Sequence, residues 1–153
     1  MQTPHAEATG LVSVERSQFG LWERSEFVED GNWLDLPLSE EIPGVTSVDG
    51  AIKIRSSIRD HYAAVTLEVT ENPVRPDGFT LIAQAPYRSL TGRLEAWTLF
   101  SGPADVALDL GGPSRNFMLS VYWDSSPELG DRAKTELLDG VERFRFVFEP
   151  AAG

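Results

Sequence analysis

The sequence contains no cysteine among its 153 residues. This absence excludes disulfide-stabilised scaffolds, zinc or iron sites with thiolate ligands, and catalysis by a cysteine nucleophile. A domain of about 150 residues buries about 70% of the surface of its unfolded chain, so a chain of this length does not need such cross-links. We therefore expect a fold that forms without a disulfide or a metal ion.

Long apolar runs and a basic leader are missing as well. No stretch reaches the roughly 18 consecutive apolar residues that a membrane helix requires. Residues 1–10 are polar, and they lack the basic start and the small-residue cleavage site of an export signal. These features predict a cytoplasmic protein, with a flexible tail over residues 1–10 and a single domain over residues 11–150.

Basic residues are scarce relative to acidic ones. The chain has 13 Lys and Arg against 24 Asp and Glu, which gives a formal net charge of -11. Residues 1–50 hold ten of the acids and only two Arg. A surface this negative repels phosphate backbones and anionic membranes, so we expect neither as a direct partner. The acidic first third either serves solubility alone or attracts a basic protein.

Helical periodicity is almost absent, and only residues 131–138 favour a short helix. Apolar and polar residues instead alternate, most clearly over residues 63–70 and over residues 143–149, where three Phe share one face. Further strands are expected over residues 11–14, 18–22, 51–55, 80–85, 92–100, 105–110 and 117–123. Gly, Pro and Asp punctuate these strands. The pattern predicts an all-β fold, a two-sheet antiparallel β-sandwich of eight or nine strands with at most one short helix.

Residues suited to catalysis are few. The two histidines are His5, in the expected tail, and His61, in a polar, turn-like stretch where a solvated or structural role is typical. No serine occupies a strand-turn-helix elbow, and the Gly111-Gly112-Pro113 turn lacks the lysine and helix of a phosphate-binding loop. We therefore predict a protein that is not an enzyme and that needs no cofactor.

A calcium site has little support in the sequence. No Asp-x-Asp-x-Asp-Gly run is present. Asp105 with Asp109, and Asp124 with Asp131, are pairs that a calcium ion would use, although turns and strand ends commonly carry such aspartates. Calcium binding stays an alternative on this basis.

The acidic connection that follows residue 22 is the candidate binding surface. Its apolar residues are expected to hold it to the body of the protein, and these are Trp33, Leu34, Leu36 and Leu38. Trp33 is also the tryptophan best placed to serve as an exposed anchor for a partner. The carboxylates around it would steer a basic partner. The predicted partner-binding residues are Glu26, Glu29, Asp30, Trp33, Asp35, Glu40 and Glu41.

Several stretches resemble known proteins. The opening Val12-Ser13-Val14-Glu15-Arg16-Ser17-Gln18-Phe19-Gly20-Leu21-Trp22 is similar to the start of a group of small actinobacterial β proteins of unknown function. It also resembles, to a lesser degree, the competence protein J family of nuclease inhibitors. The stretches 89–94, 101–103 and 117–122 are similar to later strands of the actinobacterial group.

The resemblance implies a β-sandwich that binds and silences a basic enzyme. In the related proteins, the strand after the Gly-Gly-Pro turn usually ends in basic and aromatic residues, whereas this sequence has Tyr122-Trp123-Asp124 there. Because of this difference, we assign no binding residue to this chain from the resemblance. Together with the net negative charge of the sequence, the resemblance favours an immunity or inhibitor protein that occludes a basic nuclease or toxin. The alternatives are a structural domain of a larger assembly, or a sandwich that binds a small ligand or calcium.

Overall fold

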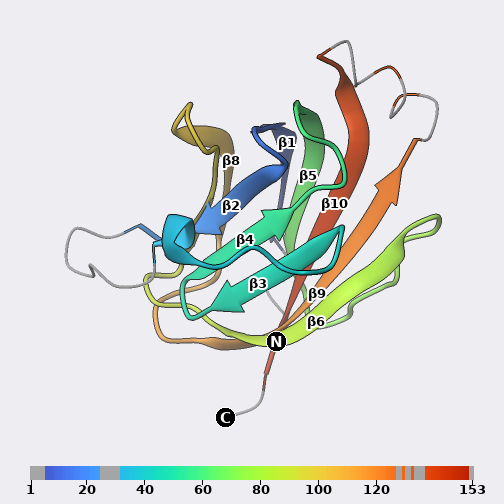
Figure 1. Ribbon diagram of the computed structural model, residues 1–153. Helices are drawn as coiled ribbons and strands as arrows, with labels where there is room; N and C mark the ends of the chain where they lie inside the picture. The colour runs from blue at the N-terminus through green and yellow to red at the C-terminus, as the bar shows by residue number, and fades with distance from the viewer. Residues whose placement is uncertain (1–5, 25–31, 127–128, 130–131, 133–136, 152–153) are drawn as a thin grey trace.

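The computed structural model describes residues 6–24, 32–126, 129, 132 and 137–151, and these residues build two facing five-stranded sheets (Figure 1). The first sheet has the order β1 (Ala6–Val14), β5 (His61–Val69), β10 (Asp139–Pro150), β9 (Asn116–Ser125) and β6 (Thr80–Arg88). The second has the order β3 (Gly44–Val48), β4 (Ala51–Arg55), β2 (Gln18–Trp22), β7 (Arg93–Trp97) and β8 (Pro103–Asp109). The predicted all-β sandwich is confirmed, with ten strands in the described residues.

Two expectations about the strands need correction. Strand β10 runs parallel to β5, whereas the other paired strands are antiparallel. Alternation within a strand fixes which side chains face inward but not the direction of the neighbouring strand, so the sequence did not reveal this pair. Residues 6–10, predicted as part of a tail, form the first half of β1 and pair with β5. Residues 1–5 lie outside the described residues.

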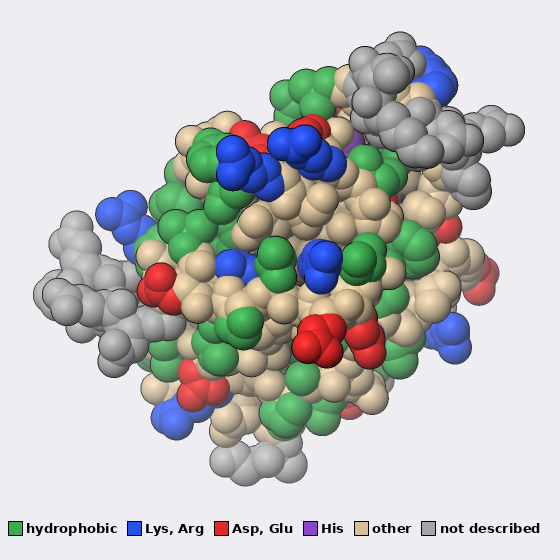
Figure 2. Space-filling model, viewed as in Figure 1, with side chains coloured by type: hydrophobic (Ala, Val, Ile, Leu, Met, Phe, Trp, Pro, Cys, Tyr) green, Lys and Arg blue, Asp and Glu red, His purple; other side chains and the backbone are tan. Residues whose placement is uncertain are grey.

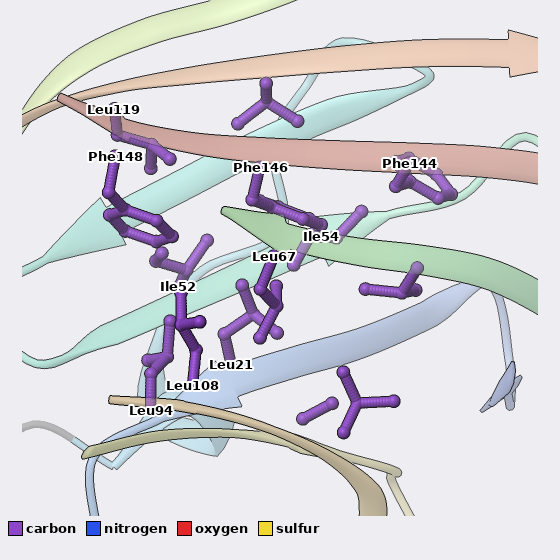
Figure 3. Close-up of a cluster of buried hydrophobic side chains, with 14 of the residues drawn as sticks. Leu21, Ile52, Ile54, Leu67, Leu94, Leu108, Leu119, Phe144, Phe146 and Phe148 are labelled. Atoms are coloured by element: carbon purple, nitrogen blue, oxygen red, sulfur yellow. The ribbon is translucent and has the colours of Figure 1, made fainter. Parts of the chain in front are cut away.

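Apolar side chains from both sheets meet in the core, where Figure 3 shows Leu21, Ile52 and Ile54 of one sheet with Phe144, Phe146 and Phe148 of the other. The predicted Phe stripe of β10 is confirmed, because Phe144, Phe146 and Phe148 are all buried. Phe19 of β2 reaches across from the other sheet, with its ring centroid 5.3 Å from that of Phe144 in an edge-to-face arrangement. Burying each such ring stabilises the fold by about 1.5–3 kcal/mol. These contacts join the two sheets into one core.

The two sides of the sandwich differ. On one side, β1 lies so close to β8 that a Cβ on Gly10 would stand 2.6 Å from Cγ2 of Val106. On the other side, the end strands β3 and β6 face each other across a groove of about 480 Å³. The sandwich is thus closed along β1 and β8 and open along β3 and β6.

Helical structure is minor. In the part of the chain that the structure describes, one 3-10 turn, η1 (Trp33–Asp35), is capped by Asn32, whose side chain accepts a hydrogen bond from the backbone N–H of Leu34. Leu129 and Arg132 have α-helical backbone. The helix predicted over residues 131–138 falls largely outside the described residues. Among the described residues, no helix is long and apolar enough to cross a membrane.

Candidate functional site

The acidic segment before β3 is attached to the outer face of the second sheet through Trp33. This side chain is 1% exposed. It covers Gly20 of β2, where an added Cβ would lie 2.2 Å from the indole ring. The prediction of Trp33 as an exposed anchor is therefore wrong: a glycine on the outward face of β2 leaves a space that only the indole fills.

Two cations of β4 hold the backbone of the same segment. The ammonium of Lys53 donates to the carbonyl oxygens of Leu34, at 3.0 Å, and Leu36, at 2.6 Å. The guanidinium of Arg55 donates to the carbonyl of Ser39 at 2.7 Å. Burial lowers the pKa of Lys53, and the charge of Asp35 offsets part of that shift. Because both cations bind carbonyl groups, they leave the carboxylates of the segment unneutralised by direct contact.

The carboxylates of the predicted binding surface fall into two groups, those that the structure describes and those outside the described residues. Asp35, Glu40 and Glu41 are exposed, and none forms an ion pair with another described residue. Glu26, Glu29 and Asp30 lie outside the described residues. Figure 2 shows acidic side chains near the middle of the face that carries the boundary between β3 and β6. We call Asp35, Glu40 and Glu41 the acidic ridge.

Other acidic side chains among residues 1–50 make contacts within the protein that stabilise the fold. Glu7 pairs with Arg145 at 3.5 Å. Glu15 accepts hydrogen bonds from the backbone N–H of Phe100 and the hydroxyl of Ser101, both at 2.8 Å. The charge asymmetry of the sequence therefore overstates the negative potential available to a partner. Apart from the paired Glu7, the exposed acids among the described residues of the first third are those of the acidic ridge and Asp49.

Glu23 is an acid that sequence reasoning did not single out. It is 2% exposed, and its carboxylate accepts hydrogen bonds from the hydroxyls of Tyr87 and Ser89 and from the backbone N–H of Gly92 at 2.9 Å. Burial raises the pKa of the Tyr87 hydroxyl, and the adjacent Glu23 charge adds to the shift. The carboxylate organises the loop between β6 and β7, which is a structural role.

His61 is not in a solvated turn, as its sequence context indicates, but is the fully buried first residue of β5. Its Nε2 lies 3.0 Å from Glu142 Oε1 and 3.1 Å from the Ser56 hydroxyl. Glu142 also accepts from the Ser57 hydroxyl, at 2.7 Å, and from the Trp123 indole, at 2.6 Å. The cluster brings together residues up to 86 positions apart, a proximity that sequence patterns do not carry.

This Ser-His-Glu cluster is not arranged for acyl transfer. A catalytic triad needs the acid on one ring nitrogen of the histidine and the serine on the other. Here Nε2 contacts both groups, Nδ1 has no hydrogen-bond partner in the described residues, and Ser56 donates its proton to Glu142. Ser56, His61 and Glu142 are each 2% exposed or less, so a substrate has no path to them.

Two of the four aspartates considered for calcium have local partners. Asp109 accepts a hydrogen bond from the N–H of Gly111 at 2.8 Å, and Asp124 accepts from Nε of Arg143 at 2.9 Å. Asp131 lies outside the described residues. In the part of the chain that the structure describes, no three His, Asp or Glu side chains are grouped so that they could hold a metal ion.

The groove between β3 and β6 lies beside Glu40 and Glu41 of the acidic ridge. Glu40 and Glu41 stand on one wall, and Gln84 of β6 stands on the other. Leu119 of β9, a buried core residue, reaches its floor. The ridge and the groove together form the candidate site: a negatively charged surface next to a recess that exposes part of the apolar interior.

We expect the substitution Lys53→Met to loosen the acidic ridge without unfolding the sandwich. Methionine keeps the apolar stem but removes both bonds to the carbonyls of Leu34 and Leu36, a loss of about 1–2 kcal/mol. Hydrogen–deuterium exchange of the amides of residues 33–41 should then accelerate about tenfold. Arg93→Met removes an exposed cation and should leave these amides unchanged. Equal exchange in both variants would contradict the anchoring role of Lys53.

Comparison with known proteins identifies the fold. No protein-family model matches the sequence, and neither does any curated protein. Among solved structures, the chain is similar to ComJ of Bacillus subtilis, an inhibitor of the DNA-degrading activity of NucA, with 13% identity and a TM-score of 0.59 over 97% of this chain and 96% of that one. It is also similar to the product of crocagin biosynthetic gene J, with 10% identity and a TM-score of 0.57 over 98% of this chain and 100% of that one. The sandwich is therefore of the same kind as that of ComJ, in keeping with the resemblance in the sequence.

Proposed function

We propose that this chain is a non-catalytic protein-binding module that inhibits a basic nuclease or toxin by occluding it. The observation that carries the proposal is the acidic ridge. Its three exposed carboxylates form no ion pair with another described residue, and Trp33, Lys53 and Arg55 fix their segment to the sheet. A fixed negative surface accelerates encounter with a positive partner and orients it. The shared fold with ComJ, whose target is a nuclease, supports the same class of partner.

The polar clusters of the described residues support a role without catalysis. The carboxylates of Glu23 and Glu142 are buried and taken up by hydrogen bonds from neighbouring side chains. They therefore contribute to stability and offer a substrate no accessible acid or base. In the proposed role the protein acts in the cytoplasm, where it would protect the cell that makes the nuclease or toxin.

The proposal is tested by charge reversal on the acidic ridge. The protein is added at low salt to an extract of cells that carry its gene, and degradation of added DNA is measured. We expect the unaltered protein to suppress the degradation. The triple variant Asp35→Lys, Glu40→Lys, Glu41→Lys should need about tenfold more protein for the same suppression, because each lost charge pair contributes up to about 1 kcal/mol.

A matched control lies on another strand. Asp105 and Asp109 are exposed on β8, at the opposite end of the second sheet. The double variant Asp105→Lys, Asp109→Lys changes the net charge in the same sense and should suppress degradation as well as the unaltered protein does. Suppression should weaken as salt rises, because exposed charges are screened. Equal losses in the two variants would show that the ridge is not the contact surface, and an unaltered protein without effect would contradict the nuclease target.

A further inference from the structure

The groove between β3 and β6 exists because its inward-facing side chains are small. Ala83 and Ala85 of β6 pair with Val121 and Leu119 of β9, whose side chains point into the core. Ser47 of β3 faces them from the other sheet. Residues of this size do not fill the space between the two sheet ends, so the groove reaches down to the small, partly buried side chains of β6 above the buried Leu119.

The strands on both sides of the groove are the last of their sheets. Strand β6 pairs only with β9, and β3 pairs only with β4, within the described residues. Each therefore has one edge whose backbone N–H and C=O groups are not used in a ladder. Such an edge binds an extended chain by adding it as a further strand. A register shift between Leu81 and Ala83 marks a bulge that limits the length available on β6.

The charged residues that line the groove are acidic, although Arg55 lies close by and donates to the carbonyl of Ser39 in the lining. Glu40 and Glu41 are exposed on its rim, and no Lys or Arg is among the described residues that line it. Two large apolar side chains flank the carboxylates, Leu38 at 43% exposure and Ile42 at 57%. Apolar contact area combined with acidic groups matches a partner segment that alternates aliphatic and basic residues.

We infer that the groove binds an extended segment of the partner protein and takes up an Arg or Lys side chain beside the Glu40–Glu41 rim. Aliphatic side chains on either side of that cation would contact the small residues of β6. The inference rests on the proposed function and makes it more specific: the acidic ridge attracts the partner, and the groove holds one segment of it.

The test uses a peptide and does not depend on a nuclease. The probe is acetyl-Thr-Val-Arg-Val-Arg-Thr-amide, titrated into the ¹⁵N-labelled full chain, with the same peptide carrying Gln in place of both Arg as the neutral reference. We expect amide shifts confined to β3, β6 and residues 38–42, and a Kd at least about fivefold weaker for the neutral peptide. The double variant Glu40→Gln, Glu41→Gln should lose a similar factor for the basic peptide, whereas Asp105→Asn, Asp109→Asn should lose none.

A second variant distinguishes the contribution of the groove's shape from that of its negative charge. Ala85→Leu fills the groove with apolar atoms and keeps both glutamates, so it should weaken binding of the basic peptide about fivefold while the spectrum of the core stays the same. Shifts spread over all acidic positions, or equal binding by the filled and open proteins, would overturn the inference. The proposed function would still stand if the protein suppressed DNA degradation and the acidic ridge were needed for it. A peptide that binds as expected, with no suppression of DNA degradation, would overturn the nuclease target alone.

Discussion

Replacing Glu23 with alanine should lower the free energy of unfolding by about 4 kcal/mol. The carboxylate satisfies the hydroxyls of Tyr87 and Ser89 and the backbone N–H of Gly92, all of them buried. Each buried donor left without an acceptor costs about 1–3 kcal/mol. The N–H of Gly92 keeps the Ser89 hydroxyl as a second acceptor at 2.9 Å, so the loss falls mainly on the hydroxyls of Tyr87 and Ser89. Because domains of this size are stable by only about 5–15 kcal/mol, the loss should be plain in urea denaturation.

Glu15 offers a matched control for Glu23. It too accepts two hydrogen bonds that hold a loop, from Phe100 and Ser101, but it is only partly buried, and water can replace it. Glu15→Ala should therefore cost about 1 kcal/mol. If Glu23→Ala does not fold, Glu23→Gln keeps the size of the side chain and one acceptor, and its loss should lie between the two. A loss no larger than that of Glu15→Ala would show that the carboxylate does not organise the loop.

Replacing Glu142 with glutamine should remove a pH-dependent part of the stability. Burial acts to raise the pKa of Glu142, but hydrogen bonds from His61, Ser56, Ser57 and Trp123 outweigh it, and the pKa falls below its ordinary value of 4.5. The native state therefore binds its proton at lower pH than the unfolded chain does. This contribution is complete above the ordinary pKa and is lost as the pH falls through it toward the native value.

At pH 7 we expect the free energy of unfolding of Glu142→Gln to be about 3 kcal/mol lower than that of the unaltered protein. The reason is that each hydrogen bond to a charged acceptor contributes about 1.5–3 kcal/mol. The difference in free energy of unfolding between the two proteins should become smaller as the pH is lowered from 6 to 3. Urea denaturation at a series of pH values measures this difference. Glu95→Gln, a partly exposed carboxylate in a long ion pair, should follow the unaltered protein throughout. A difference that stays constant down to pH 3 would mean that the native state does not lower the pKa of Glu142.

The strand pattern could be predicted because it follows from short-range chemistry. Alternation placed Val65, Leu67 and Val69 on one face, and the structure buries all three. The pattern failed where a neighbour from elsewhere in the sequence decides the environment. Trp33 lies in an acidic, loop-like stretch that indicates exposure, yet Gly20 of β2 provides the space that buries it.

The candidate site was predicted in part. Asp35, Glu40 and Glu41 are exposed as expected, because charged side chains on a connection avoid the interior unless a partner compensates for burial. Glu23 has such partners, and the sequence gives no sign of them, since Ser89 and Gly92 lie more than 60 positions away. The groove was not foreseen, because it depends on β3 and β6 ending opposite each other in different sheets.

By itself, the sequence determined the class of fold, the absence of thiol chemistry and the excess of negative charge. These properties depend on residue type and on spacing within about ten residues. The tertiary structure alone decided which carboxylates are buried, which hold loops and which remain on the acidic ridge beside the groove. The physical reason is that the environment of a side chain is set by strands that meet it in space, and their order and direction are not encoded in local alternation.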